Sequence, residues 1–412
     1  KLCKTLYFCA YDTSIKKDFD FLKNTLRCEF NALEKSSQQD ENNGFKQNHH
    51  CAFTCLSDFL SRPMLYERSF VIVAHNRAQL VKETDSIVYC GVFSLSSIWY
   101  GDKKGFFGQG YLERCRKDFR GQGISCVLPI SFKIINHLLL ENNALVCGGY
   151  VHIENIKSMR RFQNLESRGI YPRSMRFFGG HTLVTTHAND RFTQQTITLH
   201  QLTLKQSMQA VASSVNQNDF APLDHGKEIF QDERHHKGSF YVQTDKRTMV
   251  CSVWDLTEFI DLYRFPEFEH YPCLLVYNTW VFTDDSFEKN APFDEYLFLK
   301  LVCALQAKFH SFHLMWDFDE LHEQEAIEIM LKRALCSSAE KEPFPKVYGF
   351  GREIYMHFTC NDQVPLGSDE YKTRFIDPRL HSSLISMQTP VVFQKFRRET
   401  ELLSNVKKSA KL

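Results

Sequence analysis

A stretch that passes from strand to glycine loop to helix without a break constrains the fold more than any other part of this sequence. The segment RCRKDFRGQGISCVLPI (114–130) runs from a basic strand end, through two glycines, into an apolar run with helical spacing. Glycines let a backbone approach a ligand closely, and N–H groups at a helix start favour an anion such as a pyrophosphate. The alternative is a turn with no ligand. The stretch is neither a dinucleotide-binding GxGxxG nor a P-loop, because no third glycine and no GK[ST] follow.

The segments around this loop predict a mixed α/β domain. Apolar alternation predicts strands and 3.6-residue spacing predicts helices, in the order β-α-loop-β-β-β-glycine loop-α-β-α-β. The first five expected strands are 6–12, 69–76, 85–100, 108–116 and 144–153, with a hairpin between the second and third. The expected helices are 16–33, 124–140 and 155–167, and a polar loop covers 36–50.

A second region follows a Ser-, Gln- and Asn-rich passage at 205–219, which we take as the boundary between domains 1–204 and 220–412. Its patterns predict strands at 239–243, 248–254, 273–282, 312–318 and 353–358, and helices at 295–309 and 322–335. This β-α-β-α-β series is similar to the later part of the first region. The GxG of YGFGRE (348–353) lies after a helix rather than before one, so it predicts a turn. We expect His235, His236, Asp317, Asp319 and Glu320 to face solvent or to cap a helix.

Composition limits the class of protein. The chain has 412 residues, 43% hydrophobic and 24% charged, which is typical of a globular protein long enough for two domains. A net charge of +1 argues against nucleic-acid and membrane-surface partners. The sequence contains no run of about 18 apolar residues, so no membrane span is predicted.

Cysteine usage indicates a reducing, cytoplasmic compartment. The 14 cysteines form no CxxC pair, so they are expected to be buried thiols. The cluster HHCAFTC (49–55) has ligand types that suit zinc, but no second pair lies at finger-like spacing, so no metal is predicted.

Two motifs together resemble the GNAT superfamily of acyl-CoA N-acyltransferases. Its first signature, [Q/R]-x-x-G-x-[G/A] at a helix start, is matched by Arg120 and Gly123, with Ser125 in place of the usual small residue. Its second, N-x-x-[A/S]-x-x-x-[Y/F], is matched by Asn155, Ser158 and Phe162, and the glycine that should follow comes about one turn late. The resemblance covers roughly residues 1–190. It implies a GNAT fold, with a mixed central sheet flanked by helices, followed by a second, degenerate GNAT-like domain without a CoA loop.

The resemblance also implies where acyl-CoA binds. In this superfamily the strand before the loop splays from its neighbour, and the thioester lies in the gap. The strand end would hold the thioester carbonyl and pantetheine, and the loop would hold the pyrophosphate. Arg114 and its basic neighbours would meet CoA phosphates, or else form a plain basic surface. The residues expected to contact acyl-CoA are Cys115, Arg116, Lys117, Arg120, Gly121, Gln122, Gly123, Ile124, Ser125, Asn155, Ser158 and Phe162.

Direct attack of an amine on a thioester requires a base and an oxyanion donor, and a thiolate leaving group is helped by an acid. Glu113, on the strand before the loop, is the candidate base, although it also fits a solvated strand carboxylate. His152 is the candidate proton relay, or a structural histidine. Where the superfamily uses a tyrosine acid, Phe162 stands here, so Tyr171 or Tyr111 takes that role or the thiolate leaves unaided.

The resulting hypothesis is an acetyl-CoA-dependent N-acetyltransferase that acts on a small-molecule amine through a ternary complex. In layout the chain is most similar to the histidine N-acetyltransferase-like family, which suggests the α-amino group of a free amino acid such as L-histidine as the acceptor. A protein or peptide N-acetyltransferase is the alternative enzyme. A non-catalytic acyl-CoA-binding protein is the alternative from another class, favoured by Ser125 and Phe162.

Overall fold

The computed structural model of the chain describes a defined set of residues. These are 6–30, 33, 50–53, 60–76, 87–100, 103–116, 119, 127–152, 160, 167, 175–186, 197–215, 220–258, 273–319, 347–359, 377–380 and 384–388.

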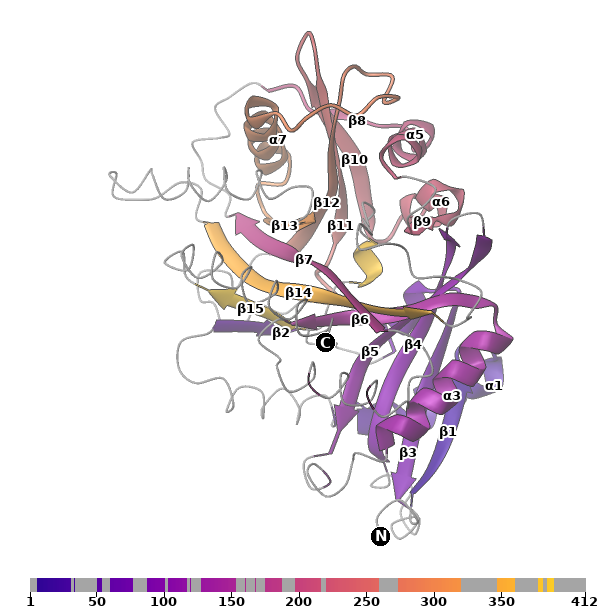
Figure 1. Cartoon of the computed structure of the whole chain (residues 1–412). Coiled ribbons are helices and arrows are strands. Elements are labelled where there is room, and N and C mark those ends of the chain that lie inside the picture. The colour runs from indigo at the N-terminus through magenta and orange to yellow at the C-terminus, as the bar shows by residue number, and fades with distance from the viewer. Residues whose placement is uncertain are drawn as a thin grey trace.

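The described strands form one continuous mixed sheet of fifteen strands with helices on both faces (Figure 1). Its main path is β1-β3-β4-β5-β6-β14-β7-β13-β12-β11-β10-β8, while β15 pairs with β14 and β2, and β9 pairs with β4. The strands are β1 Leu6–Asp12, β2 His50–Phe53, β3 Arg68–Asn76, β4 Ile87–Tyr100, β5 Lys103–Cys115, β6 Ala144–His152, β7 Met175–Thr186, β8 His200–Gln201, β9 Phe220–Pro222, β10 His236–Gln243, β11 Thr248–Asp255, β12 Cys273–Phe282, β13 His313–Asp319, β14 Val347–Thr359 and β15 Leu384–Gln388. The helices are α1 Lys16–Phe21, α3 Val127–Glu141, α5 Leu204–Ser214, α6 Lys227–Phe230 and α7 Glu295–Lys308, with short turns η2 Leu22–Leu26, η3 Pro63–Leu65, η9 Leu223–Gly226 and η12 Pro378–Leu380.

The first half is an antiparallel meander followed by one parallel strand. Strands β1, β3, β4 and β5 pair antiparallel, whereas β6 pairs parallel to β5. Parallel neighbours need a crossover, and α3 supplies it. The side chains of β3 alternate between the two faces: Phe70 and Ile72 pack with α3, while Val71 and Val73 pack with the N-terminal helix. Helices therefore cover both faces, as expected for a strand buried on both sides.

The N-terminal helix confirms the expected helix over its described part. It begins as α1 and continues through the π-helical turn η2 to residue 30. Leu22, Leu26 and Phe30 are buried at a helical spacing of four residues and lie against the sheet.

The second half repeats this plan. Strands β10, β11 and β12 are antiparallel, β13 is parallel to β12, and α7 makes the crossover. Leu297, Phe298 and Leu301 of α7 are fully buried against the inner face of these strands. In Figure 1, α7 lies on one side of the sheet, and α5 and α6 lie on the other. The strands predicted at 239–243, 248–254, 273–282 and 312–318 and the helix predicted at 295–309 are confirmed as β10 to β13 and α7. The helix predicted at 322–335 lies outside the described residues.

The two halves exchange strands where they meet. Strand β14, from the end of the chain, pairs with β6 and β7 of the first half, and β7 pairs in turn with β13 of the second half. The expected boundary 205–219 is occupied by helix α5 as far as Ser214. The division of the chain into two domains therefore stays a prediction.

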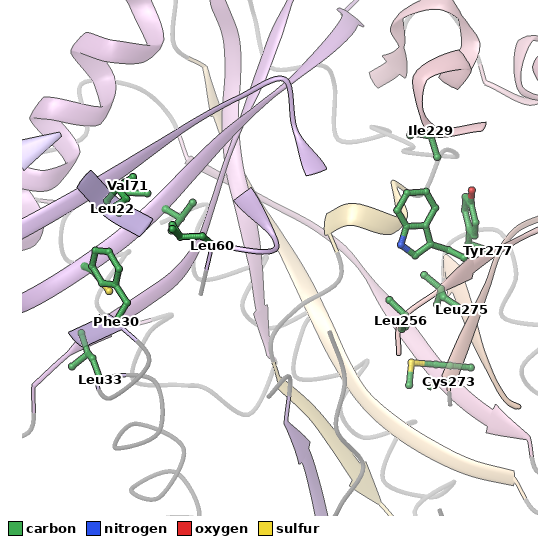
Figure 2. Close-up of a cluster of buried hydrophobic side chains, with 14 of the residues drawn as sticks. Leu22, Phe30, Leu33, Leu60, Val71, Ile229, Leu256, Cys273, Leu275 and Tyr277 are labelled. Carbon is green, nitrogen blue, oxygen red and sulfur yellow. The ribbon is translucent and has the colours of Figure 1, made fainter. Parts of the chain in front are cut away.

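A single hydrophobic cluster draws on both halves (Figure 2). Leu22, Phe30, Leu60 and Val71 come from the first half, and Ile229, Trp254, Leu275 and Tyr277 come from the second. Figure 2 shows the labelled residues of the cluster gathered in two groups, on either side of the strands that run between the halves. Burial of this apolar surface holds the halves together.

Two expectations are wrong. The segment 348–353 does not form a turn but lies within β14. Its glycines accompany a register shift between Gly349 and Arg352 opposite β7, which is a usual place for glycine in a strand. His235 does not face solvent: it is 5% exposed, stacks on Trp254 and hydrogen-bonds to Asp232. His236 beside it is half-buried, and the side chains of Asp317, Asp319 and Glu320 lie outside the described set. A short polar turn places Asp232 beside the His235 ring. The spacing of apolar residues in the sequence does not predict a contact of this kind.

Candidate functional site

The parallel pair β5–β6 diverges halfway along its length. The pairing runs from Phe106 with Ala144 to Gln109 with Gly148 and stops there. Both strands continue, β5 for six residues along β4 and β6 for four residues along β14. The two strands therefore hold their outer neighbours and separate from each other. This confirms the splayed pair that the resemblance implied.

A β-bulge lies in β5 beyond the point of divergence. Cys90 pairs with Arg114 and Val92 pairs with Tyr111, so one residue of β4, Gly91, faces the two residues 112 and 113. In a regular strand, Tyr111 and Glu113 would lie on the same face, but the bulge between them places them on opposite faces. Tyr111 packs against the cluster shared by the two halves, whereas Glu113 lies near Gly91, on the face that carries α3.

Glu113 is held by a buried tyrosine. The Tyr89 hydroxyl donates to Glu113 Oε1 at 3.2 Å, and Tyr89 itself is 1% exposed in the core beneath α3. A Cβ on Gly91 would lie 2.9 Å from the Tyr89 hydroxyl and 3.7 Å from Glu113 Cγ. Glycine at this position therefore leaves the space in which the tyrosine reaches the carboxylate.

The basic end of β5 is tied into the sheet. The Arg116 N–H donates to the Val88 carbonyl at 2.9 Å, so this N–H takes part in the ladder with β4. The Arg116 guanidinium lies 5.3 Å from the centre of the Phe119 ring, and the Arg114 guanidinium donates to the Glu113 carbonyl. Cys115 is partly buried at the edge of the α3 core.

On the opposite face, Tyr111 ends a chain of hydroxyl groups. Its oxygen lies 2.6 Å from Ser94 Oγ, which lies 2.5 Å from Ser69 Oγ, and Ser69 donates to the Pro63 carbonyl at 2.9 Å. Both serines are fully buried in β3 and β4, while Tyr111 is half-buried. Burial raises the pKa of Tyr111 to about 12.

Charged and aromatic groups from both ends of the chain surround Tyr111. The Arg62 guanidinium lies 5.2 Å from the centre of its ring, and the Tyr66 ring lies 6.2 Å away. Arg379 covers the other side of Tyr66 at 4.8 Å, and its carbonyl accepts from Arg62 Nε.

Arg379 is 7% exposed and its charge is matched. It pairs with Asp377 at 2.7 Å and with Glu228 of α6 at 2.8 Å. Burying a guanidinium is costly without such partners. The segment 377–380 thus connects the second half to the Tyr111 side of the first.

The predicted site residues fall into two groups. Glu113, Cys115 and Arg116 lie together at the end of β5, and the backbone of His152 lies at the end of β6. The others lie outside the described residues: Lys117, Arg120, Gly121, Gln122, Gly123, Ile124, Ser125, Asn155, Ser158, Phe162 and Tyr171. The helix that follows the loop is confirmed as α3.

Sequence reasoning missed Tyr89, Ser69, Ser94 and Arg379. Ser94 left a signal, because it stands between Phe93 and Leu95 in a largely apolar strand and a buried hydroxyl needs a partner, whereas Ser69 follows Arg68 at the start of its strand and left none. Arg379 left none, since its contact with Arg62 spans 317 residues.

No protein-family model matches the chain, and no curated protein sequence does. Among solved structures, a GCN5-related N-acetyltransferase from Anabaena variabilis is 10% identical, with a TM-score of 0.42 over 86% of this chain and 73% of that one. An N-myristoyltransferase from Saccharomyces cerevisiae with bound myristoyl-CoA is 10% identical, with a TM-score of 0.43 over 92% and 84%. A GCN5-related N-acetyltransferase from Kribbella flavida is 8% identical, with a TM-score of 0.36 over 70% of this chain and only 60% of its own length. These are remote likenesses.

None of the helices in the described ranges is long and apolar enough to cross a membrane. No group of three or more His, Cys, Asp or Glu side chains within those ranges is placed to hold a metal ion. The side chains of the cluster 49–55 lie outside the described set.

Proposed function

We propose that the chain is an acyl-CoA-dependent N-acyltransferase. The divergence of β5 from β6 after Gln109 and Gly148 is the observation that supports this most directly. Where the two strands stop pairing with each other, the backbone N–H and C=O groups that face the gap can form hydrogen bonds with a thioester and pantetheine. The glycine loop between β5 and α3 adds a place for the pyrophosphate.

In this proposal each predicted residue keeps its role. Acyl-CoA lies between the strand ends, near Cys115 and Arg116, with its pyrophosphate on Arg120–Ser125 and beside the helix that the sequence predicts from Asn155. Glu113 acts as base from the α3 face, oriented by Tyr89, and His152 relays protons.

The finer assignment is an acetyl group and a small amine. Acetyl-CoA is the proposed co-substrate, and the α-amino group of a free amino acid such as L-histidine is the proposed acceptor. A near-neutral chain suits a small acceptor better than a strongly charged macromolecule. A protein or peptide acceptor, or acyl-CoA binding without turnover, are the other outcomes that the experiment below distinguishes.

The test is thermal shift with CoA, acetyl-CoA and myristoyl-CoA, followed by release of free thiol with a panel of free amino acids. Stabilisation by acetyl-CoA with turnover of one amino acid supports the full proposal. Preference for myristoyl-CoA would keep the acyltransferase and reject the acetyl group. Stabilisation without thiol release, with amino acids or with peptides, favours a binding protein, and no stabilisation by any of the three rejects the proposal.

Gly123→Val tests the loop. The added side chain should block the pyrophosphate and raise the KM for acetyl-CoA at least about tenfold with little loss of stability. Unchanged CoA binding by this variant would show that the site is misplaced.

A further inference from the structure

The hydroxyl chain that ends at Tyr111 has a defined direction. Each hydroxyl carries one proton, and the chain finishes at the carbonyl of Pro63, which accepts only. Ser69 must therefore give its proton to Pro63, and Ser94 must give its proton to Ser69. It follows that Tyr111 donates its own proton to Ser94. A chain that stops at a carbonyl cannot pass a proton onward.

The Tyr111 ring is fixed from two sides. The Arg62 guanidinium lies over its face and the Tyr66 ring lies beside it, while the backbone carbonyl of Arg379 holds Arg62 in place. The phenol oxygen thus has a set position, its proton is committed to Ser94, and its remaining lone pair is directed elsewhere. Such a group is a preorganised hydrogen-bond acceptor.

Tyr111 also has the right place along β5. It is two residues beyond Gln109, where pairing with β6 ends, and it immediately precedes the bulge. It is half-buried, whereas Tyr66 behind it is 5% exposed.

We propose, on the basis of the function proposed above, that Tyr111 accepts a hydrogen bond from an N–H of the attacking amine, and that Ser94 and Ser69 position it for this. Tyr111 is then not the acid that protonates the leaving thiolate. The amine lone pair forms the C–N bond and the C–S bond breaks with its electron pair on sulfur. The proton that nitrogen loses balances the one that sulfur gains, and neither proton passes through Tyr111.

The acid and the acceptor roles predict opposite results for Ser94→Ala. If Tyr111 accepts from the amine, Ser94→Ala frees its proton to turn toward the amine, and kcat/KM falls about tenfold. If Tyr111 were the acid, the freed proton would become easier to donate, and kcat would hold or rise. Ser94→Thr keeps the hydroxyl and should restore most of the activity.

The second half offers a matched control. Ser239 and Ser252 form the same kind of buried cross-strand pair, 2.9 Å apart, between β10 and β11. Ser252→Ala removes a buried serine hydroxyl of similar setting without touching β5.

The experiment measures thiol release from acetyl-CoA with the amino-acid panel and with hydroxylamine, a small amine that needs no dedicated pocket. Tyr111→Phe and Ser94→Ala should each lower kcat/KM for the amine about tenfold or more and keep the KM for acetyl-CoA within about twofold. The control variant Ser252→Ala should have the kinetics of the wild type. Thermal shift with acetyl-CoA shows that each variant is folded and binds.

Two results overturn the inference alone: an active Tyr111→Phe enzyme with unchanged kinetics, or a Ser94→Ala enzyme at least as fast as wild type. A wild-type protein that neither binds acyl-CoA nor releases thiol overturns the proposed function, and the inference with it.

Discussion

The molecule contains two crossover units built on one plan, β5–α3–β6 and β12–α7–β13. In each, the parallel strands pair over four positions and then separate, at Gln109 and Gly148 in the first and at Val276 and Trp316 in the second. In each, the leading strand carries a two-residue bulge opposite a single residue of its antiparallel neighbour. A tyrosine, Tyr111 or Tyr277, immediately precedes the bulge.

The units differ at the positions where chemistry would occur. The second bulge residue is Glu113 in the first unit and Thr279 in the second. In the first unit, glycines lead to a helix whose first turn has no acidic residue. In the second, Asp294 caps α7 by accepting from the Leu297 N–H, and Glu295 stands in the first turn. The start of α7 is thus satisfied by the chain's own carboxylates and repels an anion. Topology alone does not make a binding site.

The largest expected difference between the units is in turnover. Glu113→Gln removes the proposed base and should lower kcat about 100-fold or more, with acyl-CoA affinity unchanged. Thr279→Val, at the matching bulge position, removes a buried hydroxyl that has no hydrogen-bond partner among the described residues, so activity should not change. Thiol-release kinetics across pH decide this: a Glu113→Gln enzyme with wild-type kcat would remove Glu113 as the base.

Acid sensitivity should be the next difference and should be strongest in the second half, although burial also lowers the pKa of His75 on β3 in the first half. Burial lowers the pKa of His236, at the start of β10, to about 4, although Asp232 acts in the opposite direction. The unfolded chain binds this proton below about pH 6.5 and the folded chain only near pH 4. Stability from this group is therefore complete above pH 6.5 and is lost as the pH falls, by about 3 kcal/mol at pH 4.

Denaturant unfolding between pH 4 and 7 measures this loss. His236→Gln should flatten the acid limb, whereas His137→Gln, at a side chain that is 72% exposed on α3, should not. An acid limb of wild-type steepness in the His236 variant would contradict the assignment.

The packing of the two crossover helices gives a smaller difference. Toward α7, β12 presents Leu274 and Val276, but toward α3, β5 presents Gly108. A Cβ at Gly108 would lie 2.3 Å from Leu139 Cδ2, and Leu139 is 1% exposed, so it has little room to move. Gly108→Val should cost about 1–3 kcal/mol.

A double-mutant cycle checks the cause of that cost. Gly108→Ala should be less destabilising in a Leu139→Ala background than in wild type, because the smaller side chain leaves room for the new methyl group. Equal costs in the two backgrounds would show that α3 does not set the requirement for glycine.

The sequence was sufficient for the elements of the two crossover units, because these depend on local periodicity, and the divergence of β5 from β6 was implied by the resemblance that the glycine loop carries. The sequence did not predict α5, which occupies most of the expected linker 205–219. It was insufficient for β14, where glycines that mark a register shift have the same appearance as a turn. It was equally insufficient for the surroundings of Tyr111, because Arg62 and Arg379 are 317 residues apart in the chain and are in contact only in the folded structure. Of the candidate site, Glu113 could be predicted from its place before the loop, while its partner Tyr89 could not, because the pairing register of β4 decides it.

The smallest expected effect concerns the cap of α7 and tests the expectation that the second unit does not bind an anion. Asp294→Ala removes the hydrogen bond to the Leu297 N–H and a partly exposed ion pair with Arg247, so it should cost about 1 kcal/mol. Asp294→Asn keeps the capping oxygen and should cost less. Thr203→Ala, which removes the cap of α5, is the matched control and should cost a similar amount. None of the three variants should change the thermal shift with acetyl-CoA. A changed shift in Asp294→Ala alone would indicate that an anion binds at α7, which would contradict the proposed difference between the two units.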